Sequence, residues 1–515
     1  MIADARSLWE LIERRVDATP DALLAVDEDK RTMTFREYRD AAERAAAGFA
    51  ELGVGEGTPV SWQLPTWLES IVLVGALSRV GAVQNPILPI YREREVGFVT
   101  KQTGAQVVIV PSTWKGFDYE AMARAIAEGQ PGLEVLVVDR TLPDGDPASL
   151  APAVTPPDDP AELPVRWAFY TSGTTADPKG AKHTDRTIMA SAYGMAVALE
   201  LTEQDRGALA FPFTHIGGIG LLCAGLMSGS RTIVIEAFDP ATSIPLLQRE
   251  GVTLAGSGTP FHMAYLAAQR EQPGTPLFPD VRAFPGGAAP KPPQLHYDIV
   301  SEMGGVGIVS GYGLTECPII TMGAVRDTDE HLADTEGSAT PGVEIKVVTL
   351  DGKVAGPDEE GEIRARGPQL FRGYVDSTLD ADALDEEGFF RTGDLGKLDA
   401  EGYITITGRL KDVIIRKGEN ISAKEVEDLL FTSSAIADVA VIGLPDDRSG
   451  ERACAIVVPA DPEAPPTLED VFEFCSDAGL MTQKVPEQLE IVDVLPRNAT
   501  GKVLKHELRK QYTAK

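Results

Sequence analysis

The chain has 515 residues, 43% of them hydrophobic and 24% charged, an ordinary soluble composition that should divide into several domains. Its 47 Lys and Arg residues against 78 Asp and Glu give a net charge of −31. This charge argues against a nucleic-acid partner, because proteins that bind nucleic acids present a basic surface. Negative potential also slows anionic ligands, so any phosphate site must gather its positive charge locally.

The cysteines and the N-terminus indicate the cytosol. The four cysteines are far apart and have no metal-ligand spacing, which favours free thiols in a reducing compartment: Cys223, Cys317, Cys454 and Cys475. The first 15 residues lack the apolar core of a signal peptide. Apolar stretches such as 71–77 are too short to span a bilayer. We therefore expect a cytoplasmic protein without a membrane span.

The first 140 residues alternate between helical and strand patterns. Residues 35–52 are Ala-rich with helical spacing, and residues 66–80 carry an apolar helical stripe. Short apolar runs, typical of strands buried on both faces, occur at 58–64, 106–110 and 133–138. This alternation predicts an α/β fold with largely parallel sheets.

After residue 150 the sequence pattern changes twice. A Pro- and acid-rich connector at 152–164 precedes a strand at 165–170, and beyond about residue 340 short strands with tight turns predict a β-rich subdomain. Further on, strands and helices alternate in an α+β module at 424–430, 437–445, 451–459, 468–478 and 487–496. We expect a large N-terminal domain of mixed, mostly parallel sheets with the β-rich subdomain (1–408), a hinge (409–412) and a small, mobile α+β C-terminal domain (413–515).

The segment YTSGTTADPKGAKH (170–183) predicts a phosphate-binding loop. A plain surface turn explains its Gly, Ser and Thr content poorly, because the segment follows a buried-looking strand directly. A Walker A loop requires a second Gly and a magnesium-binding Ser or Thr, but Pro178 and Gly180 occupy those positions. The remaining interpretation is a mobile loop that closes over a triphosphate, with Lys179 as its positive charge.

Two further segments carry groups that a nucleotide needs. In SGYGLTECP (310–318), Tyr312 suits stacking on a planar ligand, and Thr315 and Glu316 add a hydroxyl and a carboxylate. In RTGDLG (391–396), a carboxylate in a tight turn, Asp394, suits two ribose hydroxyls, although an ordinary Asx-turn explains it equally well in isolation.

Three more segments have open interpretations. Residues 406–427 are dense with charge, which fits either a solvated loop or, through Gly418, a segment that changes partners. PRNATGKVLKHELRK (496–510) should end in a helix capped by Asn498 or Thr500, with Lys502 in its first turn, where the helix dipole disfavours a cation. His215, before a Gly-rich stretch, is either structural or part of a pocket.

Taken in order, these segments resemble the adenylate-forming superfamily of acyl-CoA synthetases, luciferases and peptide-synthetase adenylation domains. TSGTTADPKG resembles its phosphate loop, GYGLTE its adenine-and-phosphate motif, RTGDLG its ribose motif, GRLKD its hinge and PRNATGK its catalytic-lysine loop. The resemblance covers nearly the whole chain. It implies a ligase that uses ATP and Mg²⁺ to convert a carboxylic acid to acyl-AMP, and then transfers the acyl group to coenzyme A.

The resemblance also implies roles for individual residues. ATP would be bound by Thr171, Ser172, Gly173, Thr174, Thr175, Lys179, Gly287, Ala288, Tyr312, Thr315, Asp394, Arg409 and Lys502. Catalysis would rest on Lys502, Thr315, Glu316 and His215, with Glu316 holding the metal. The acyl pocket would include His215, Ile216, Gly217, Gly220, Phe261, Gly286, Gly311 and Cys317, and the hinge and CoA path Lys411, Lys417, Gly418 and Glu419.

Some residues depart from the family pattern or bear on the substrate. Ala176 replaces a common Gly of the phosphate loop, Lys417 a second Gly, and Lys411 a common hinge Asp. No acidic residue lies between His215 and Leu222, which disfavours a free amino acid as substrate.

The segment SRVGAVQNPILPIYREREVGFV (78–99) looks most like synthetases for medium-chain, cyclic or steroid-side-chain acids. The alternatives are an acyl-AMP ligase that loads a carrier protein, a non-catalytic ATP-binding homologue and a P-loop ATPase. We expect small-molecule partners only, and a homodimer is an assembly to test.

Overall fold

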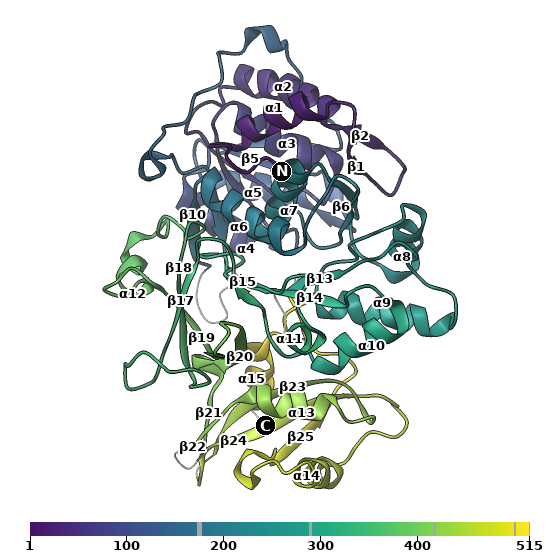
Figure 1. The fold of residues 1–515 in the computed structure, drawn as a ribbon. Helices are drawn as coiled ribbons and strands as arrows, with labels where there is room; N and C mark the ends of the chain where they lie inside the picture. Colours follow the sequence, from purple (N-terminus) through teal and green to yellow (C-terminus); the bar gives the residue numbers. More distant parts are fainter. Residues whose placement is uncertain (172–177, 288–290, 417–418, 447, 499–500, 514–515) are drawn as a thin grey trace.

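The computed structural model describes residues 1–171, 178–287, 291–416, 419–446, 448–498 and 501–513 (Figure 1). Within this part, two mostly parallel sheets and the helices around them form the N-terminal half of the molecule. The six-stranded sheet has the order β10 (Gly180–His183), β9 (Trp167–Tyr170), β4 (Val83–Pro86), β3 (Pro59–Trp62), β5 (Val107–Val110) and β8 (Glu134–Val137). All its neighbouring pairs are parallel except the β9–β10 hairpin.

A four-stranded sheet lies beside it, in the order β11 (Arg206–Leu209), β12 (Arg231–Val234), β1 (Leu23–Val26) and β2 (Thr32–Thr34). The helices of this half are α1 (Leu8–Ala18), α2 (Phe35–Glu51), α3 (Leu68–Arg79), α4 (Glu93–Thr103), α5 (Tyr119–Glu128), α6 (Asp185–Ala198) and α7 (Ile216–Ser228), and a small hairpin joins β6 (Thr113–Trp114) to β7 (Phe117–Asp118). Helix α2 begins where the sequence places it because Thr34 and Glu37 form a reciprocal capping box.

The third sheet connects this half to the rest of the molecule. Its order is β13 (Phe284–Gly287), β14 (Ile308–Tyr312), β15 (Thr321–Met322) and β16 (Ser338–Ala339), and it is accompanied by α8 (Pro240–Arg249), α9 (Thr259–Glu271), α10 (Pro293–Met303) and α11 (Asp329–Asp334). Strands β13 and β14 are parallel, and their carboxyl ends carry the Gly287 and Tyr312 segments. Ligands bind at such strand ends in open α/β sheets.

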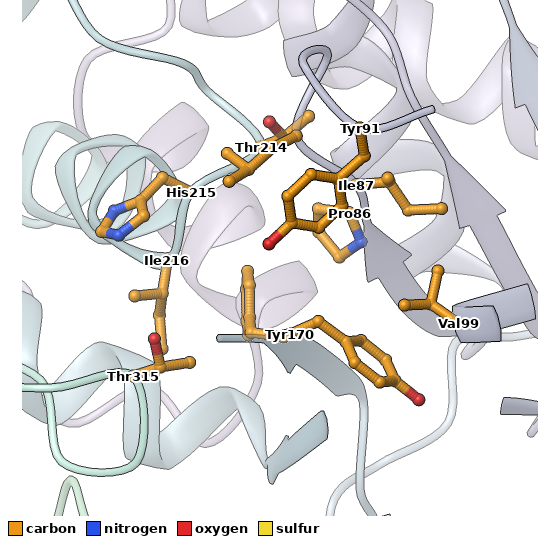
Figure 2. A pocket seen from close by; sticks show the side chains of 11 residues that line it. Pro86, Ile87, Tyr91, Val99, Tyr170, Thr214, His215, Ile216 and Thr315 are labelled. Carbon is orange, nitrogen blue, oxygen red and sulfur yellow. The ribbon is translucent and has the colours of Figure 1, made fainter. Parts of the chain in front are cut away.

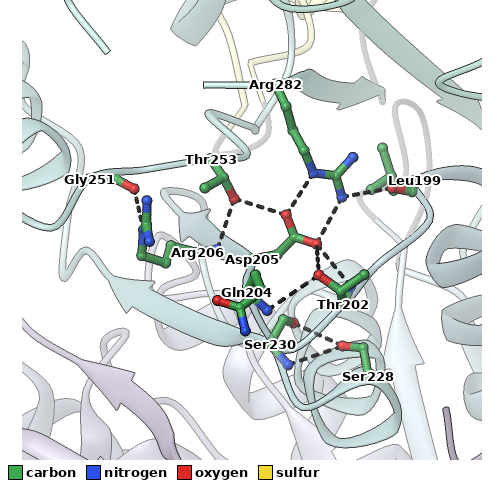
Figure 3. Close-up of polar contacts among 10 residues, drawn as sticks. All are labelled: Leu199, Thr202, Gln204, Asp205, Arg206, Ser228, Ser230, Gly251, Thr253 and Arg282. Carbon is green, nitrogen blue, oxygen red and sulfur yellow. Dashed lines mark hydrogen bonds and ion pairs between the residues drawn. The ribbon is translucent and has the colours of Figure 1, made fainter. Parts of the chain in front are cut away.

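An ion pair to a buried carboxylate joins this lobe to the parallel sheets (Figure 3). Arg282 donates through Nε to Asp205 Oδ1 at 2.6 Å and through Nη2 to Asp205 Oδ2 at 2.9 Å. The same guanidinium donates to the carbonyl of Leu199 at 2.7 Å, after the end of α6, and Thr253 donates its hydroxyl to Asp205 at 3.0 Å. Since Asp205 is only 3% exposed, its charge depends on these partners.

The predicted β-rich subdomain is an antiparallel sheet of β17 (Glu344–Val348), β18 (Gly361–Arg366), β19 (Phe390–Leu398) and β20 (Ile404–Arg409), with the short helix α12 (Asp380–Ala383) beside it. Its core packs Phe371, Tyr374 and Phe390 around Cys317. In Figure 1 this sheet lies between the parallel sheets and the C-terminal module.

The C-terminal module has hydrophobic clusters of its own. A 3₁₀ turn (Leu410–Asp412) separates β20 from a sheet of β22 (Glu419–Ile421), β21 (Ile414–Arg416), β24 (Gly450–Pro459), β23 (Ile436–Asp446) and β25 (Gln488–Ile491). Its helices are α13 (Ala423–Phe431), α14 (Leu468–Asp477) and α15 (Lys505–Thr513). The two clusters that fill this module contain only residues after Asp412, as expected for an independent core.

Candidate active site

Three of the predicted nucleotide-binding residues form one cluster around the buried Asp394 carboxylate. Asp394 on β19 pairs directly with Arg409 on β20, so the two side chains are cross-strand neighbours. Arg409 Nε lies 2.7 Å from Asp394 Oδ1, and the Tyr312 hydroxyl donates to Asp394 Oδ2 at 2.9 Å. The expectation that Asp394 sits in a tight turn is wrong. It lies within β19 at an irregularity of the strand, where the register with β18 shifts between Glu362 and Arg364 and the preceding Gly393 has φ 68°.

Glu316 is buried beside Tyr374, which links it to Lys179 of the predicted phosphate loop. The Tyr374 hydroxyl donates to Glu316 Oε1 at 2.7 Å, and Lys179 Nζ lies 5.4 Å from the centroid of the Tyr374 ring. Burial raises the pKa of Glu316, while the Tyr374 hydroxyl and the charge of Lys179 oppose that rise. A carboxylate that is costly to ionise in isolation fits a cation site, because a bound cation would stabilise its charge.

The predicted phosphate loop lies between the antiparallel strands β9 and β10. The backbone N–H of Thr171 donates to the carbonyl of Lys179 at 3.0 Å, which closes the base of the loop. The chain then enters strand β10, whereas a Walker A loop enters a helix. The hairpin therefore argues independently against a P-loop ATPase. Ser172, Gly173, Thr174, Thr175 and Ala176 lie outside the described residues.

The predicted glycines at the end of the third sheet are required by close packing. Gly287 and Gly311 are partners across β13 and β14, and a Cβ added to Gly287 would lie 2.5 Å from the Gly311 carbonyl oxygen. A Cβ on Gly286 would lie 2.7 Å from Cε1 of His262. The chain can pack this closely at these positions only because no side chain is present. Ala288 lies outside the described residues.

Lys502 reaches the Asp394–Arg409 cluster from the C-terminal module. Burial and the charge of Arg409 lower its pKa to about 7, while Asp394 has the opposite influence. The predicted helix at the end of the 496–510 segment is confirmed as α15, but Lys502 does not lie in its first turn, because α15 begins at Lys505. Asn498 instead closes a turn, in which its side-chain oxygen accepts from the Lys502 N–H at 2.9 Å and its own N–H donates to the Lys502 carbonyl at 2.9 Å. Thr500 lies outside the described residues.

The Lys502 turn also contacts the N-terminal lobe. A Cβ on Gly501, with φ 85°, would lie 2.9 Å from the Pro260 ring at the start of α9.

In the predicted hinge, partial burial and the charge of Arg409 lower the pKa of Lys411. Lys417, Gly418 and the side chain of Glu419 lie outside the described part of the chain.

A cavity extends from Thr315 into the parallel half of the molecule (Figure 2). Its lining residues come from the ends of strands, the loop after β4 and the start of α7: Pro86, Ile87, Leu88, Tyr91, Val99, Phe169, Tyr170, Thr214, His215, Ile216 and Thr315. Of the predicted site residues, His215, Ile216 and Thr315 therefore lie together. Thr214 directly precedes His215, and the others come from the 78–99 segment and from the end of β9, which sequence spacing alone does not link to His215.

His215 is a neutral N-cap. Its Nδ1 accepts from the Gly217 N–H at 3.1 Å, so the ring proton is on Nε2. Burial lowers the pKa of His215 to about 4, which leaves a neutral donor at physiological pH. Another neutral histidine, His183, was missed by sequence reasoning. It donates from Nε2 to the Thr315 carbonyl at 2.8 Å and so holds the backbone beside Glu316.

The remaining predicted acyl-pocket residues lie elsewhere. Gly217 and Gly220 belong to the first turns of α7, and Phe261 on α9 packs edge-on against Phe238, with centroids 4.8 Å apart. Cys317 is fully buried in the hydrophobic cluster of the β-rich subdomain, so its place in the acyl pocket stays a prediction. Its side chain follows Glu316 in sequence but points into that separate core.

Comparisons with known proteins agree with this arrangement. The family described as AMP-binding enzyme matches residues 12–375, and the AMP-binding enzyme C-terminal domain matches residues 425–502. The chain is 34% identical over 517 residues to the medium-chain fatty-acid–CoA ligase of Escherichia coli strain K12, covering 98% of this chain and 90% of the relative. It is 30% identical to the salicyl-AMP ligase / salicyl-S-ArCP synthetase of Mycobacterium tuberculosis strain H37Rv, covering 99% and 90%.

The fold is also similar to that of a solved structure. The fold matches ATP-bound MatB from Rhodopseudomonas palustris with a TM-score of 0.88 and 27% identity, covering 98% of both chains. Among the described residues, every helix falls short of the length and apolar character that a membrane crossing requires.

Proposed function

We propose, from the premise that the chain belongs to the AMP-binding enzyme family and is an AMP-forming acid–CoA ligase, that its substrate is a medium-chain, cyclic or steroid-side-chain carboxylic acid. The observation that carries the site assignment is the convergence of Lys502 on the Asp394–Arg409 pair. Groups from both parts of the chain thereby meet where a nucleotide and an acid must react.

The reaction has two steps. In the first, a carboxylate oxygen attacks the α-phosphorus of ATP, and the bond to the bridging oxygen breaks to release pyrophosphate. In the second, the sulfur of coenzyme A attacks the carbonyl carbon of acyl-AMP, AMP leaves, and the thiol proton passes to solvent. Neither step requires a covalent enzyme nucleophile.

The chain's own residues hold charge and position in the first step. Asp394 accepts hydrogen bonds from the ribose, Tyr312 lines the adenine site, and Lys179 binds the terminal phosphates. Lys502 binds the carboxylate and the α-phosphate together, where negative charge accumulates in the transition state. Thr315 adds a hydroxyl at the α-phosphate.

Glu316 is the proposed Mg²⁺ ligand. Carboxylate oxygens are preferred by this ion, and the buried Glu316 already has one oxygen fixed by Tyr374. When bound, Mg²⁺ supplies charge neutralisation to the phosphates.

The second step requires a different position of the C-terminal module. We propose residues 409–412 as the hinge, with Lys411 as its central residue and residues 1–408 and 413–515 as the two domains. The 3₁₀ turn at Leu410–Asp412, between two separately packed cores, supports this boundary. Lys417, Gly418 and Glu419 would then line the pantetheine path.

The apolar residues of the Thr315 cavity and the medium-chain relative support the acid class. A carrier protein as acyl acceptor is the second candidate, favoured by the similarity to a salicyl-S-ArCP synthetase. The four cysteines are buried and free, which supports a reducing cytoplasmic location.

A pyrophosphate-release panel of carboxylic acids, run with and without coenzyme A, tests the proposal. We expect pyrophosphate and AMP with medium-chain or cyclic acids, and acyl-CoA only when coenzyme A is present. Pyrophosphate release without any coenzyme A thioester would favour the carrier-loading candidate. Failure to turn over any acid would contradict the proposed function.

A further inference from the structure

Two hydroxyl groups in the Thr315 cavity are buried without a hydrogen-bond partner. Tyr91 and Thr214 both line the cavity, and among the described residues neither the Tyr91 phenol oxygen nor Thr214 Oγ1 has a partner. Figure 2 shows the Tyr91 hydroxyl pointing into the space bounded by Ile216 and Tyr170. Because buried polar groups are nearly always paired, two unpaired hydroxyls in one cavity require an explanation.

The hydroxyl groups of the neighbouring tyrosines have hydrogen-bond partners. The Tyr170 hydroxyl points away from the cavity (Figure 2) and donates to Gln102 Oε1 at 2.8 Å. Tyr119, which packs near the same loop, donates to the Pro89 carbonyl at 2.8 Å. Tyr91 therefore differs from Tyr170 in directing its hydroxyl into the cavity, and Thr214 Oγ1 is a second hydroxyl of the lining without a partner among the described residues.

The position of Tyr91 is fixed by its backbone. Its N–H donates to the Leu88 carbonyl at 3.0 Å, and its own carbonyl accepts from Gln63 Nε2 at 3.1 Å and from Arg92 Nη1 at 2.9 Å. The loop is thus held on both sides of the ring, so a small relaxation of the chain does not carry the phenol to water.

The chemistry of the two hydroxyls defines what they can bind. Burial raises the pKa of Tyr91 to about 12, so the phenol keeps its proton and donates. A threonine hydroxyl both donates and accepts. The wall around them includes Pro86, Ile87 and Val99, which suits hydrocarbon. The lining residues therefore suit an apolar skeleton that carries an acceptor oxygen.

We propose that the preferred acid of this enzyme carries a hydroxyl or oxo group on its acyl portion, and that Tyr91 and Thr214 bind this oxygen inside the cavity. The inference rests on the proposed function, since it identifies the acid within the class given there. The carboxylate of such an acid lies near Thr315, and its oxygenated part extends toward the loop after β4.

A site built to hydrogen-bond a substrate oxygen discriminates against the analogue that lacks it, because its own polar groups are then left unpaired. One net hydrogen bond corresponds to about a tenfold preference. We therefore expect wild-type enzyme to favour oxygenated acids by at least about tenfold in kcat/KM over hydrocarbon acids of the same skeleton.

The experiment compares matched acids by pyrophosphate release: octanoic acid with 7-oxo- and 7-hydroxyoctanoic acid, and cyclohexanecarboxylic acid with its 4-oxo analogue. Tyr91→Phe and Thr214→Val each remove one hydroxyl while nearly preserving shape, and each should reduce the preference for the oxygenated acid by about tenfold. Tyr38→Phe is the matched control. Its phenol is also buried without a partner among the described residues, but in the hydrophobic core, so its preference should equal that of wild type.

Each outcome decides the proposal. Loss of the preference in Tyr91→Phe or Thr214→Val, with an unchanged KM for coenzyme A, supports it. A wild-type enzyme that prefers the hydrocarbon acids overturns it, while their turnover leaves the proposed function intact. A rise in the KM for coenzyme A with an unchanged acid preference also overturns it, since the hydroxyls would then serve the thiol. Failure to turn over any acid overturns the proposed function and the acid class with it.

Discussion

Replacing Lys502 with alanine should separate the two half-reactions. The amine belongs to the C-terminal module but lies within the electrostatic reach of Asp394 and Arg409. Removing one preorganised donor from a developing phosphoryl charge costs about 2.7–4 kcal/mol, or about 100- to 1000-fold in rate. We expect that loss in adenylation, measured by acid-dependent ATP–pyrophosphate exchange. Thioester formation from synthetic acyl-AMP and coenzyme A should change by less than about threefold, because the lysine acts before the module moves.

The pH dependence adds a second measurement of the same residue. Burial and Arg409 lower the pKa of Lys502 to about 7, so the free enzyme loses this positive charge as the pH rises through 7. Since kcat/KM reports the pKa values of the free enzyme, kcat/KM for ATP in adenylation should fall above pH 7 by up to about tenfold per unit. Lys502→Ala should lack this limb. Its residual adenylation should be flat across the same range.

Lys510→Ala is the control. Lys510 is an exposed cation near the end of α15, so its removal changes the net charge equally without touching the site. It should retain both half-reactions and the wild-type pH profile. Equal losses of adenylation and thioester formation in Lys502→Ala would refute the assignment, as would a wild-type alkaline limb that survives the substitution.

Three further predictions test the surrounding structure. Arg282→Ala should lower the free energy of unfolding in urea by about 1–3 kcal/mol, because it removes the charged partner of the buried Asp205 carboxylate, which then keeps only donors from Thr202 and Thr253. A loss below about 0.5 kcal/mol would contradict the role given to this pair. Tyr374→Phe should raise the Mg²⁺ concentration for half-maximal adenylation several-fold, because it frees the Glu316 oxygen that the phenol fixes; an unchanged Mg²⁺ titration would argue against this positioning role. Gly287→Ala should raise the KM for ATP by about tenfold. The added Cβ would lie 2.5 Å from a backbone carbonyl oxygen, and such overpacking costs about 1–3 kcal/mol. An unaltered KM with intact folding would show that this edge of the sheet does not contact the nucleotide.

The sequence predicted elements best where local signals agree. Helix α2 was expected at 35–52 and occurs at Phe35–Glu51, because an apolar helical period coincides with a strong cap. The strand expected at 106–110 occurs at Val107–Val110, because a short continuous apolar run suits a strand that is buried on both faces. The prediction failed at Lys502, because a turn closed by Asn498 competes with a cap that would start the helix earlier.

The cavity was the part that local patterns could not specify. Tyr91 and Thr214 are 123 positions apart by their numbers, and Tyr374 is 58 residues from the Glu316 that it contacts. No short-range period connects such pairs, since their proximity follows from sheet order and crossover paths. The segment around Tyr91 was linked to the acyl group only through family resemblance.

By itself, the sequence determined the family motifs, the order of the domains and the charge available for binding an anion, because these depend on residue type and spacing along the chain. The tertiary structure decided which of those residues share a site. It paired Asp394 with Arg409 across two strands, placed Cys317 in a separate core and left two hydroxyls unpaired in one cavity. The physical reason is that burial and hydrogen-bond satisfaction are properties of three-dimensional neighbours, which a linear pattern does not contain.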